Sequence, residues 1–169
     1  DPEIDCQADI TVNNDPDVCG AIVEYCDPQA PAQVLYAVSG SGNTPSSLYT
    51  LDPATGAATL VGPTGFNHIT AIAIHPTTGV IYAHANGLTG GVCTTGGQLL
   101  TLDPNTGAGT LIAATTLKVP DMTFSPAGVL YAWYECDLTT FSTDGLCTIN
   151  TTTGVGTPVG PSSQGTAGT

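Results

Sequence analysis

The sequence predicts an all-β protein: three four-stranded repeats that follow an extended N-terminal strand. Short apolar runs such as Ala71–Ile74 and Leu99–Leu102 are bounded by clusters of Pro, Asn, Thr and Gly, which is the pattern of strands and turns. Helix signals are scarce, because 21 Gly and 13 Pro interrupt every long window. The third observation is an internal repeat, which fixes the number of units.

The repeat is marked by a strand that ends in Tyr-Ala. Val34-Leu35-Tyr36-Ala37 returns at residues 80–83 and 129–132, at offsets of 46 and 49 residues. Each copy is followed by a turn of the type Leu-Asp-Pro-x-Thr-Gly, at residues 51–56, 102–107 and, as Ile-Asn-Thr-Thr-Thr-Gly, 149–154. We therefore expect a β domain over residues 18–169, with repeats at about 18–65, 66–116 and 117–160 and a short C-terminal tail.

The turn residues have separate physical roles. Asp or Asn opens the turn by accepting a hydrogen bond from its own backbone two residues on, and Pro fixes φ at the next corner. Gly supplies the positive φ that lets the strand reverse. A second turn, His75-Pro76-Thr77-Thr78-Gly79, precedes the Tyr-Ala strand of the second repeat, and Ser125 takes the place of His75 in the third.

The repeat pattern over residues 30–160 resembles the blades of bacterial secreted β-propellers that carry D-P-x-T-G turns. A period of 46–51 residues with four strands lies in the range of propeller blades. The resemblance implies propeller-like sheets and says nothing about activity.

The first residues differ from the repeats. Residues 5–16 and 18–23 resemble the opening of a hyalin repeat, an immunoglobulin-like extracellular module that begins "C-P-A-D-I-T-V" and continues "C-G-A-x-V", with Gln7 in place of the Pro. The resemblance implies an extracellular β-strand arm, which we place at residues 1–17. Residues 19–27 also fit the first strand of the first repeat.

Charge excludes several classes of partner. One Lys+Arg stands against 14 Asp+Glu, for a formal net charge of −13. A single Lys118 cannot neutralise nucleic-acid phosphates, and an anionic membrane surface would repel the chain. No apolar run approaches the length of a transmembrane helix, so we expect no membrane insertion.

The cysteines predict an oxidising compartment. Their number is even and no C-x-x-C occurs, so disulfides fit better than a zinc site. Cys136 and Cys147 flank one loop, which suggests a local bridge, and Cys93 then needs a partner in the N-terminal region or on another chain. A start at Asp1 without Met is expected after signal-peptide removal, and Asn150 opens a possible glycosylation sequon. The disulfide candidates are Cys6, Cys19, Cys26, Cys93, Cys136 and Cys147.

No enzyme motif appears, and we expect no enzymatic activity and no cofactor. Nucleophile-elbow, P-loop and dinucleotide-binding patterns are missing. His68 and His84 form a conceivable metal pair, although ordinary hydrogen bonding explains scattered histidines more simply. Trp133, next to Tyr134 and Glu135, suggests either a sugar-stacking patch or, as we expect, a residue packed between blades.

Three blades are too few for an ordinary propeller ring, so sheet edges should remain open to other chains. The leading hypothesis is therefore a self-assembling extracellular subunit of a filament or surface appendage, with copies of itself as partners. The arm would pair with a neighbour's sheet, Ile10 and Val12 would face its core, and disulfides would lock the product. The arm alternatively folds back on its own blades. Calcium ions could offset the repulsion between acidic arms, where six carboxylates crowd: Asp1, Glu3, Asp5, Asp9, Asp15 and Asp17. A secreted propeller-type module that binds glycan or protein is the alternative function.

Overall fold

The computed structural model describes residues 34–40, 44–87, 96–137 and 143–159. The chain divides into two units, residues 1–33 and 34–169, and every described residue belongs to the second. The predicted arm at residues 1–17, its boundary with the β domain and the tail after residue 159 therefore lie outside the described residues. Among those that are described, no helix has the length and apolar character needed to cross a membrane.

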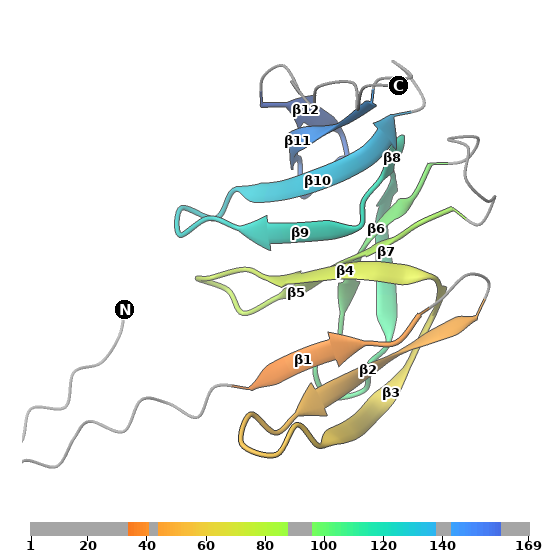
Figure 1. Ribbon diagram of the computed structural model, residues 1–169, viewed down its shortest axis with the longest axis vertical. Helices are drawn as coiled ribbons and strands as arrows, with labels where there is room; N and C mark the ends of the chain where they lie inside the picture. The colour runs from red at the N-terminus through yellow and green to blue at the C-terminus, as the bar shows by residue number, and fades with distance from the viewer. Residues whose placement is uncertain (1–33, 41–43, 88–95, 138–142, 160–169) are drawn as a thin grey trace, which may run out of the picture. The chain divides into compact units, whose positions relative to one another are not determined.

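The described residues of the second unit form three antiparallel sheets, so the predicted all-β class with blade-like repeats is confirmed (Figure 1). Sheet 1 contains β1 (Leu35–Val38), β2 (Pro45–Leu51) and β3 (Ala58–Asn67). Sheet 2 contains β4 (Ile69–Ile74), β5 (Ile81–Ala85), β6 (Gln98–Leu102) and β7 (Gly109–Ala114). Sheet 3 contains β8 (Leu117–Lys118), β9 (Asp121–Phe124), β10 (Leu130–Asp137), β11 (Thr143–Ile149) and β12 (Gly156–Pro158).

In sheets 1 and 2 each strand pairs with the next along the chain, and in sheet 3 β8 and β9 both pair with β10. The turns follow the predicted chemistry: Asp52 Oδ1 accepts the N–H groups of Ala54 and Thr55 at 2.7 and 3.1 Å, and Gly56 has a φ of 71°. The same arrangement recurs at Asp103 and Asn150 in the next two repeats. In the second type of turn, His75 Nδ1 replaces the carboxylate oxygen as the acceptor and accepts hydrogen bonds from the N–H groups of Thr77 and Thr78.

The four strands expected in each repeat are found in sheet 2. Sheet 1 has three strands among the described residues, and sheet 3 has five because β8 and β9 both pair with β10. The inner strand of sheet 3 breaks at Val119-Pro120. Pro120 has no N–H to give to a ladder, and the polar backbone groups of Val119 bind a side chain of sheet 2 instead.

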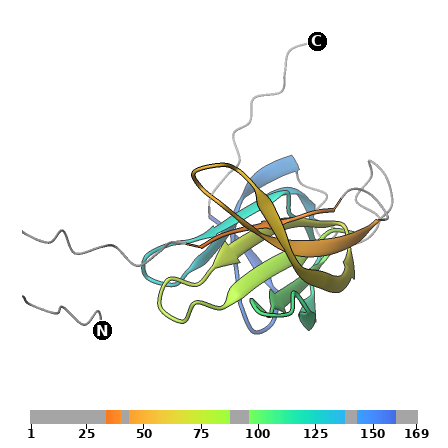
Figure 2. The same cartoon turned by 90° about the horizontal axis from the view of Figure 1, so that it is seen from below.

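The core lies in two layers on either side of sheet 2. Residues 81, 83 and 85 of β5 face sheet 1, where Leu48 belongs to the same buried cluster. Tyr82 points to the opposite face and packs against the cluster shared with sheet 3. In Figure 2, turned by 90°, the sheets overlie one another. Sheet 2 is thus covered on both faces, as the middle blade of a stack should be.

The outer strands contact the turns of the following sheet. Gly62 of β3 lies against the turn of the second repeat, where a Cβ added to Gly62 would stand 2.1 Å from the Thr106 carbonyl oxygen. Ala113 of β7 lies similarly against Gly154, the turn glycine of the third repeat. This close approach requires a residue without a side chain at position 62.

Candidate functional site

Six of the candidate residues, five of them in the N-terminal region, lie outside the described residues. They are Ile10, Val12, Cys6, Cys19, Cys26 and Cys93. The strand pairing of the arm, its acidic cluster and the bridges of these cysteines therefore stay predictions.

The register of sheet 3 argues against the local bridge between Cys136 and Cys147. Cys136 is opposite Thr143 in the ladder, and Cys147 is opposite Ala132. The offset of four residues from position 143 to position 147 puts the Cα atoms of the two cysteines about 13 Å apart along the strand. A disulfide spans less than about 7 Å between Cα atoms, so this strand register does not favour that pairing. The Cys147 side chain instead lies buried in the core between sheets 2 and 3.

Asn150 is exposed, at the start of the third Asx turn. Its Oδ1 accepts the N–H groups of Thr152 and Thr153, each at 2.9 Å. In the equivalent turns, the backbone N–H of Ala54 lowers the pKa of Asp52 and that of Asn105 lowers the pKa of Asp103. The sequon asparagine therefore has a structural role at this position.

Trp133 does not pack inside the stack of sheets, contrary to expectation. It is 37% exposed, whereas its neighbours Ala132 and Tyr134 belong to the core. The side chain lies on the face of sheet 3 that points away from sheet 2, directly opposite Leu146 on β11. A hollow of about 130 Å³ on this face is lined by Asp121, Met122, Thr123, Tyr131, Ala132, Trp133 and Leu146.

The edge of β1 is open among the described residues. β1 pairs with β2 alone, whereas its equivalent in sheet 2, β5, pairs with β4 on one side and β6 on the other. One row of β1 backbone N–H and C=O groups consequently has no strand partner within residues 34–40, 44–87, 96–137 and 143–159. Such an edge can accept a further strand.

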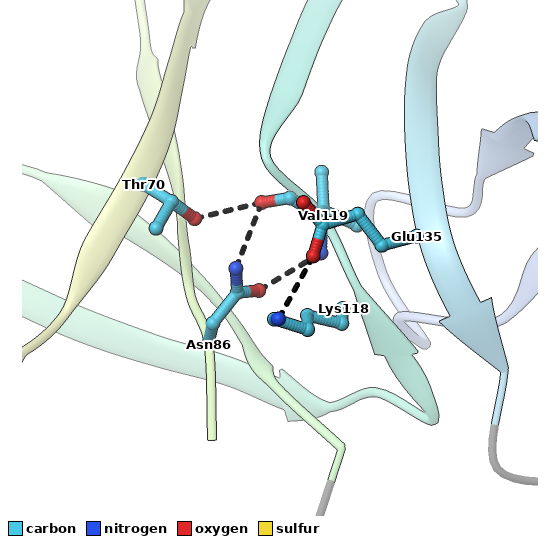
Figure 3. Close-up of polar contacts among 5 residues, drawn as sticks. All are labelled: Thr70, Asn86, Lys118, Val119 and Glu135. Atoms are coloured by element: carbon cyan, nitrogen blue, oxygen red, sulfur yellow. Dashed lines mark hydrogen bonds and ion pairs between the residues drawn. The ribbon is translucent and has the colours of Figure 1, made fainter. Parts of the chain in front are cut away.

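A polar clamp, formed by Thr70, Asn86 and the Val119 peptide, joins sheets 2 and 3 (Figure 3). Asn86 Oδ1 accepts the Val119 N–H at 2.8 Å, and Asn86 Nδ2 donates to the Val119 carbonyl at 3.3 Å. Thr70 Oγ1 donates to the same carbonyl at 2.7 Å. Beside the clamp, Lys118 Nζ lies 2.8 Å from a carboxylate oxygen of Glu135, with both side chains partly exposed. The clamp satisfies the buried peptide at the strand break and therefore fixes how sheet 3 sits on sheet 2.

His84 lies fully buried next to this clamp. Its Nε2 is 2.9 Å from Thr115 Oγ1, and because that hydroxyl donates to the Leu117 carbonyl, the ring nitrogen is the donor of the pair. Nδ1 is buried without a hydrogen-bond partner among the described residues. Burial lowers the pKa of His84 to about 4, and the Asn86 side chain offsets only part of that shift. The imidazole is thus neutral at physiological pH.

The ring occupies the space of a missing side chain. A Cβ on Gly97 would stand 2.1 Å from His84 Cε1. In the first repeat, the position of Gly97 is taken by Ser46, whose Oγ accepts the Ile69 N–H at 3.0 Å and so links sheet 1 to sheet 2. These inter-sheet polar contacts were missed by sequence reasoning. Ser46 of the first repeat is replaced by Gly97 in the second, where His84 lies on the neighbouring strand. This replacement was the sequence signal that could have revealed the contact between His84 and Gly97.

A cavity of about 690 Å³ lies at the ends of β3, β5 and β7. It is lined by Gly65, Phe66, Asn67, Ala85, Asn86, Gly87, Gly96, Gly97, Gln98, Ala114 and Thr115. These residues offer amide, hydroxyl and backbone groups, and no acid, base or thiol for catalysis. His68 and His84 do not join a larger ligand set: within the described part of the chain, no three His, Cys, Asp or Glu side chains gather to hold a metal ion.

Comparisons with known proteins add little to this geometry. No protein-family model matches the sequence, and no curated protein does so. One matching solved structure is described as "Structure of Dos1 propeller", with 18% sequence identity and a TM-score of 0.39. The match covers 66% of this chain and 30% of the propeller chain, so the present chain spans less than a third of that protein's length. The blade-like architecture therefore rests on the three sheets themselves.

Proposed function

We propose that the chain is a structural subunit of an extracellular filament or surface appendage, joined head-to-tail by β-strand complementation and stabilised by disulfides. The observation that carries this proposal is the open edge of β1, which lacks, among the described residues, the strand that β4 supplies to β5 in the next sheet. A strand donated by another copy would satisfy these backbone groups. A donor from an identical subunit makes a heterologous contact, which yields a ring or a filament.

The donor in this proposal is the arm at residues 1–17. Its Ile10 and Val12 share one face of an extended strand because side chains alternate. Tyr36 and Val38 of β1 point to the core cluster that contains Leu48. Placed beside β1, the two arm residues would extend this apolar layer, while Thr11 and Asn13 would face the other way.

The charge of the chain bears on the same proposal. A net charge of −13 makes copies repel one another, so assembly should strengthen with ionic strength and with Ca²⁺, which oxygen ligands favour. No motif for catalysis supports an enzymatic function, and the cavity lining offers none of the usual catalytic groups.

Deletion of residues 1–17 tests the strand donation. The shortened chain should keep its β circular dichroism and its cooperative unfolding but remain monomeric in light scattering, while the full chain forms polymers. A synthetic peptide of residues 1–17 should bind the shortened chain one to one, and the double change Ile10→Asp and Val12→Asp in the peptide should abolish binding. The matched control peptide carries Thr11→Asp and Asn13→Asp. Polymers of the shortened chain would contradict the proposal, and non-reducing peptide mass spectrometry identifies the bridges.

The alternative, a secreted propeller-type binding module for glycan or protein, is favoured by one observation. Trp133 is exposed beside the Asp121 carboxylate in the hollow on sheet 3, and aromatic faces next to polar groups suit sugar rings. Because Trp133 is the single Trp, its fluorescence reports directly on this face. Saturable quenching by an oligosaccharide, lost in Trp133→Ala, would favour the binding module over the filament subunit.

A further inference from the structure

The two ends of the sheet stack differ from its middle. Sheet 2 has buried side chains on both faces, one set packed on sheet 1 and the other on sheet 3. Sheets 1 and 3 contribute to these clusters from one face only. The repeat makes it possible to compare the same position with and without a neighbouring sheet.

The first such position is the residue before the Tyr-Ala pair. Ile81 and Leu130 are each 1% exposed, because each faces the preceding sheet. Leu35 occupies the same position in sheet 1 and is 44% exposed. The face of sheet 1 that carries Leu35 thus has the side chains of a buried contact, without a partner among the described residues.

The opposite end shows the converse pattern. Leu48 and Leu99 are fully buried, because each faces the following sheet. Leu146 occupies the same position in sheet 3 and is 43% exposed. Tyr82, which packs edge-on against Phe124 across the sheet 2–sheet 3 contact, corresponds to Tyr131 on the same uncovered face as Leu146.

We propose that these two faces bind each other between copies: the face of sheet 1 that carries Leu35 packs onto the face of sheet 3 that carries Trp133 and Leu146. This inference rests on the proposed head-to-tail assembly and names its contact surface. The chain already contains two examples of this contact. At the junction of sheets 1 and 2 the face with Ile81, the equivalent of Leu35, meets the face with Leu48, the equivalent of Leu146. At the junction of sheets 2 and 3 the face with Leu130 meets the face with Leu99 in the same way. A second copy continues the stack in the same sense.

The chemistry of the faces supports a heterologous pairing. Among the described residues, the face of sheet 1 that carries Leu35 is apolar and has no charged side chain: the strand register places Leu35, Ala37, Tyr49, Leu51 and Leu60 on it. The uncovered face of sheet 3 has the acidic Asp121 beside its apolar centre, opposite Trp133 in the ladder. Two sheet 3 faces would bring like charges together, whereas an uncharged sheet 1 face avoids this repulsion. The two faces are thus unlike and complementary.

Two full-length variants test this contact. Leu35→Glu places a charge on the sheet 1 face, and Leu146→Glu places one on the sheet 3 face. Each variant alone should fail to form polymers, because every contact needs one face of each kind. An equimolar mixture should form dimers of twice the 17.0 kDa chain mass and nothing larger, through the unaltered sheet 3 face of the first variant and the unaltered sheet 1 face of the second.

The control is Leu111→Glu, which alters an equally exposed leucine of sheet 2, at neither end of the stack, and should polymerise like the unaltered chain. Circular dichroism verifies folding, and Leu35→Thr with Leu146→Thr provides milder versions that should weaken assembly at least tenfold. Trp133 emission should shift to shorter wavelength in the unaltered polymer and in the mixed dimer, because the contact covers the ring.

Four outcomes would overturn the inference. Polymers of both glutamate variants, with assembly still lost on arm deletion, would leave strand donation standing without this contact. Dimers of one variant alone would indicate an isologous contact, and a folded mixture that stays monomeric would show that the faces do not bind. If the unaltered full-length chain never assembles, the proposed function fails together with this inference.

Discussion

The side chain of Asn86 binds both the backbone N–H and the backbone C=O of Val119, across the junction of two sheets. Val119 is fully buried, so its N–H and C=O cannot turn to water when the partner is removed. The pairing explains why the inner strand of sheet 3 can break at this point without leaving an unsatisfied peptide in the core.

Asn86→Ala should lower the free energy of unfolding by about 2 kcal/mol, because it orphans the buried Val119 N–H while Thr70 still serves the carbonyl. Differential scanning calorimetry should show a fall in Tm of roughly 5 °C. Asn105→Ala, at an exposed turn position, is the matched control and should change Tm little. Equal effects of the two substitutions would show that the clamp contributes no stability.

Stability should fall as the pH drops from about 6.5 to about 4, because of His84. Its folded pKa of about 4 lies below the unfolded value of 6.5, so the unfolded chain binds a proton first as pH falls. The neutral His84 contributes fully to the free energy of unfolding above pH 6.5. This contribution falls by roughly 3 kcal/mol by pH 4. Urea denaturation at several pH values measures the slope.

His84→Gln should flatten this slope, and His75→Gln, in an exposed turn, should keep it. Lowered carboxylate pKa values at Asp52 and Asp103 act in a more acidic window, below about pH 4, so they do not mask the histidine. An unchanged slope in His84→Gln would contradict the assignment.

Gly62→Ala should destabilise the junction between sheets 1 and 2. The new Cβ would stand 2.1 Å from the Thr106 carbonyl oxygen, which is backbone and cannot rotate away. We expect a loss of about 2 kcal/mol in chemical denaturation, typical of overpacking. Ala113→Gly, the reverse change at the equivalent position of the next repeat, should cost about 1 kcal/mol or less, as expected for extra backbone freedom. A Gly62→Ala protein as stable as the unaltered chain would show that the two sheets can separate freely.

Asn150→Asp should preserve the third Asx turn, because Asp52 and Asp103 support the same turn in the other repeats. Asn150→Ala should lower stability by about 1 kcal/mol, since it removes the acceptor of two backbone N–H groups. Both substitutions remove the glycosylation sequon, so their difference in thermal unfolding isolates the turn. Equal stability of the two variants would rule out this role.

The strands and turns were predictable because their signals are local. The Asx turn at Asp52 and the histidine turn at His75 depend on residues two or three positions apart. The repeat presents the same kind of turn pattern several times along the chain, which makes it easier to recognise. The exposed side chain of Trp133 was not predictable from its strand position, because alternation does not tell which face has a neighbour. The register of Cys136 and Cys147 likewise depends on strand pairing that loop length alone does not determine.

Contacts between sheets were the least predictable part. Asn86 and Val119 are 33 positions apart, and nothing in their own neighbourhoods links them. The repeat predicts that Leu35 and Leu146 are apolar strand residues. Their exposure could not be predicted, because it arises from the positions of sheets 1 and 3 at the two ends of the stack. Sequence patterns therefore determined the strands and turns of this fold, and packing between sheets determined which of their faces stay exposed.

The Asn86 clamp also has a geometric consequence. It holds the third blade at one angle to the second through three hydrogen bonds to the backbone of a single residue, Val119. In a polymer built from such blades, every copy would repeat that angle, so a tilt of a few degrees would accumulate over successive subunits. The amide of one buried asparagine would then help to set the helical pitch and curvature of an object many times longer than the molecule itself.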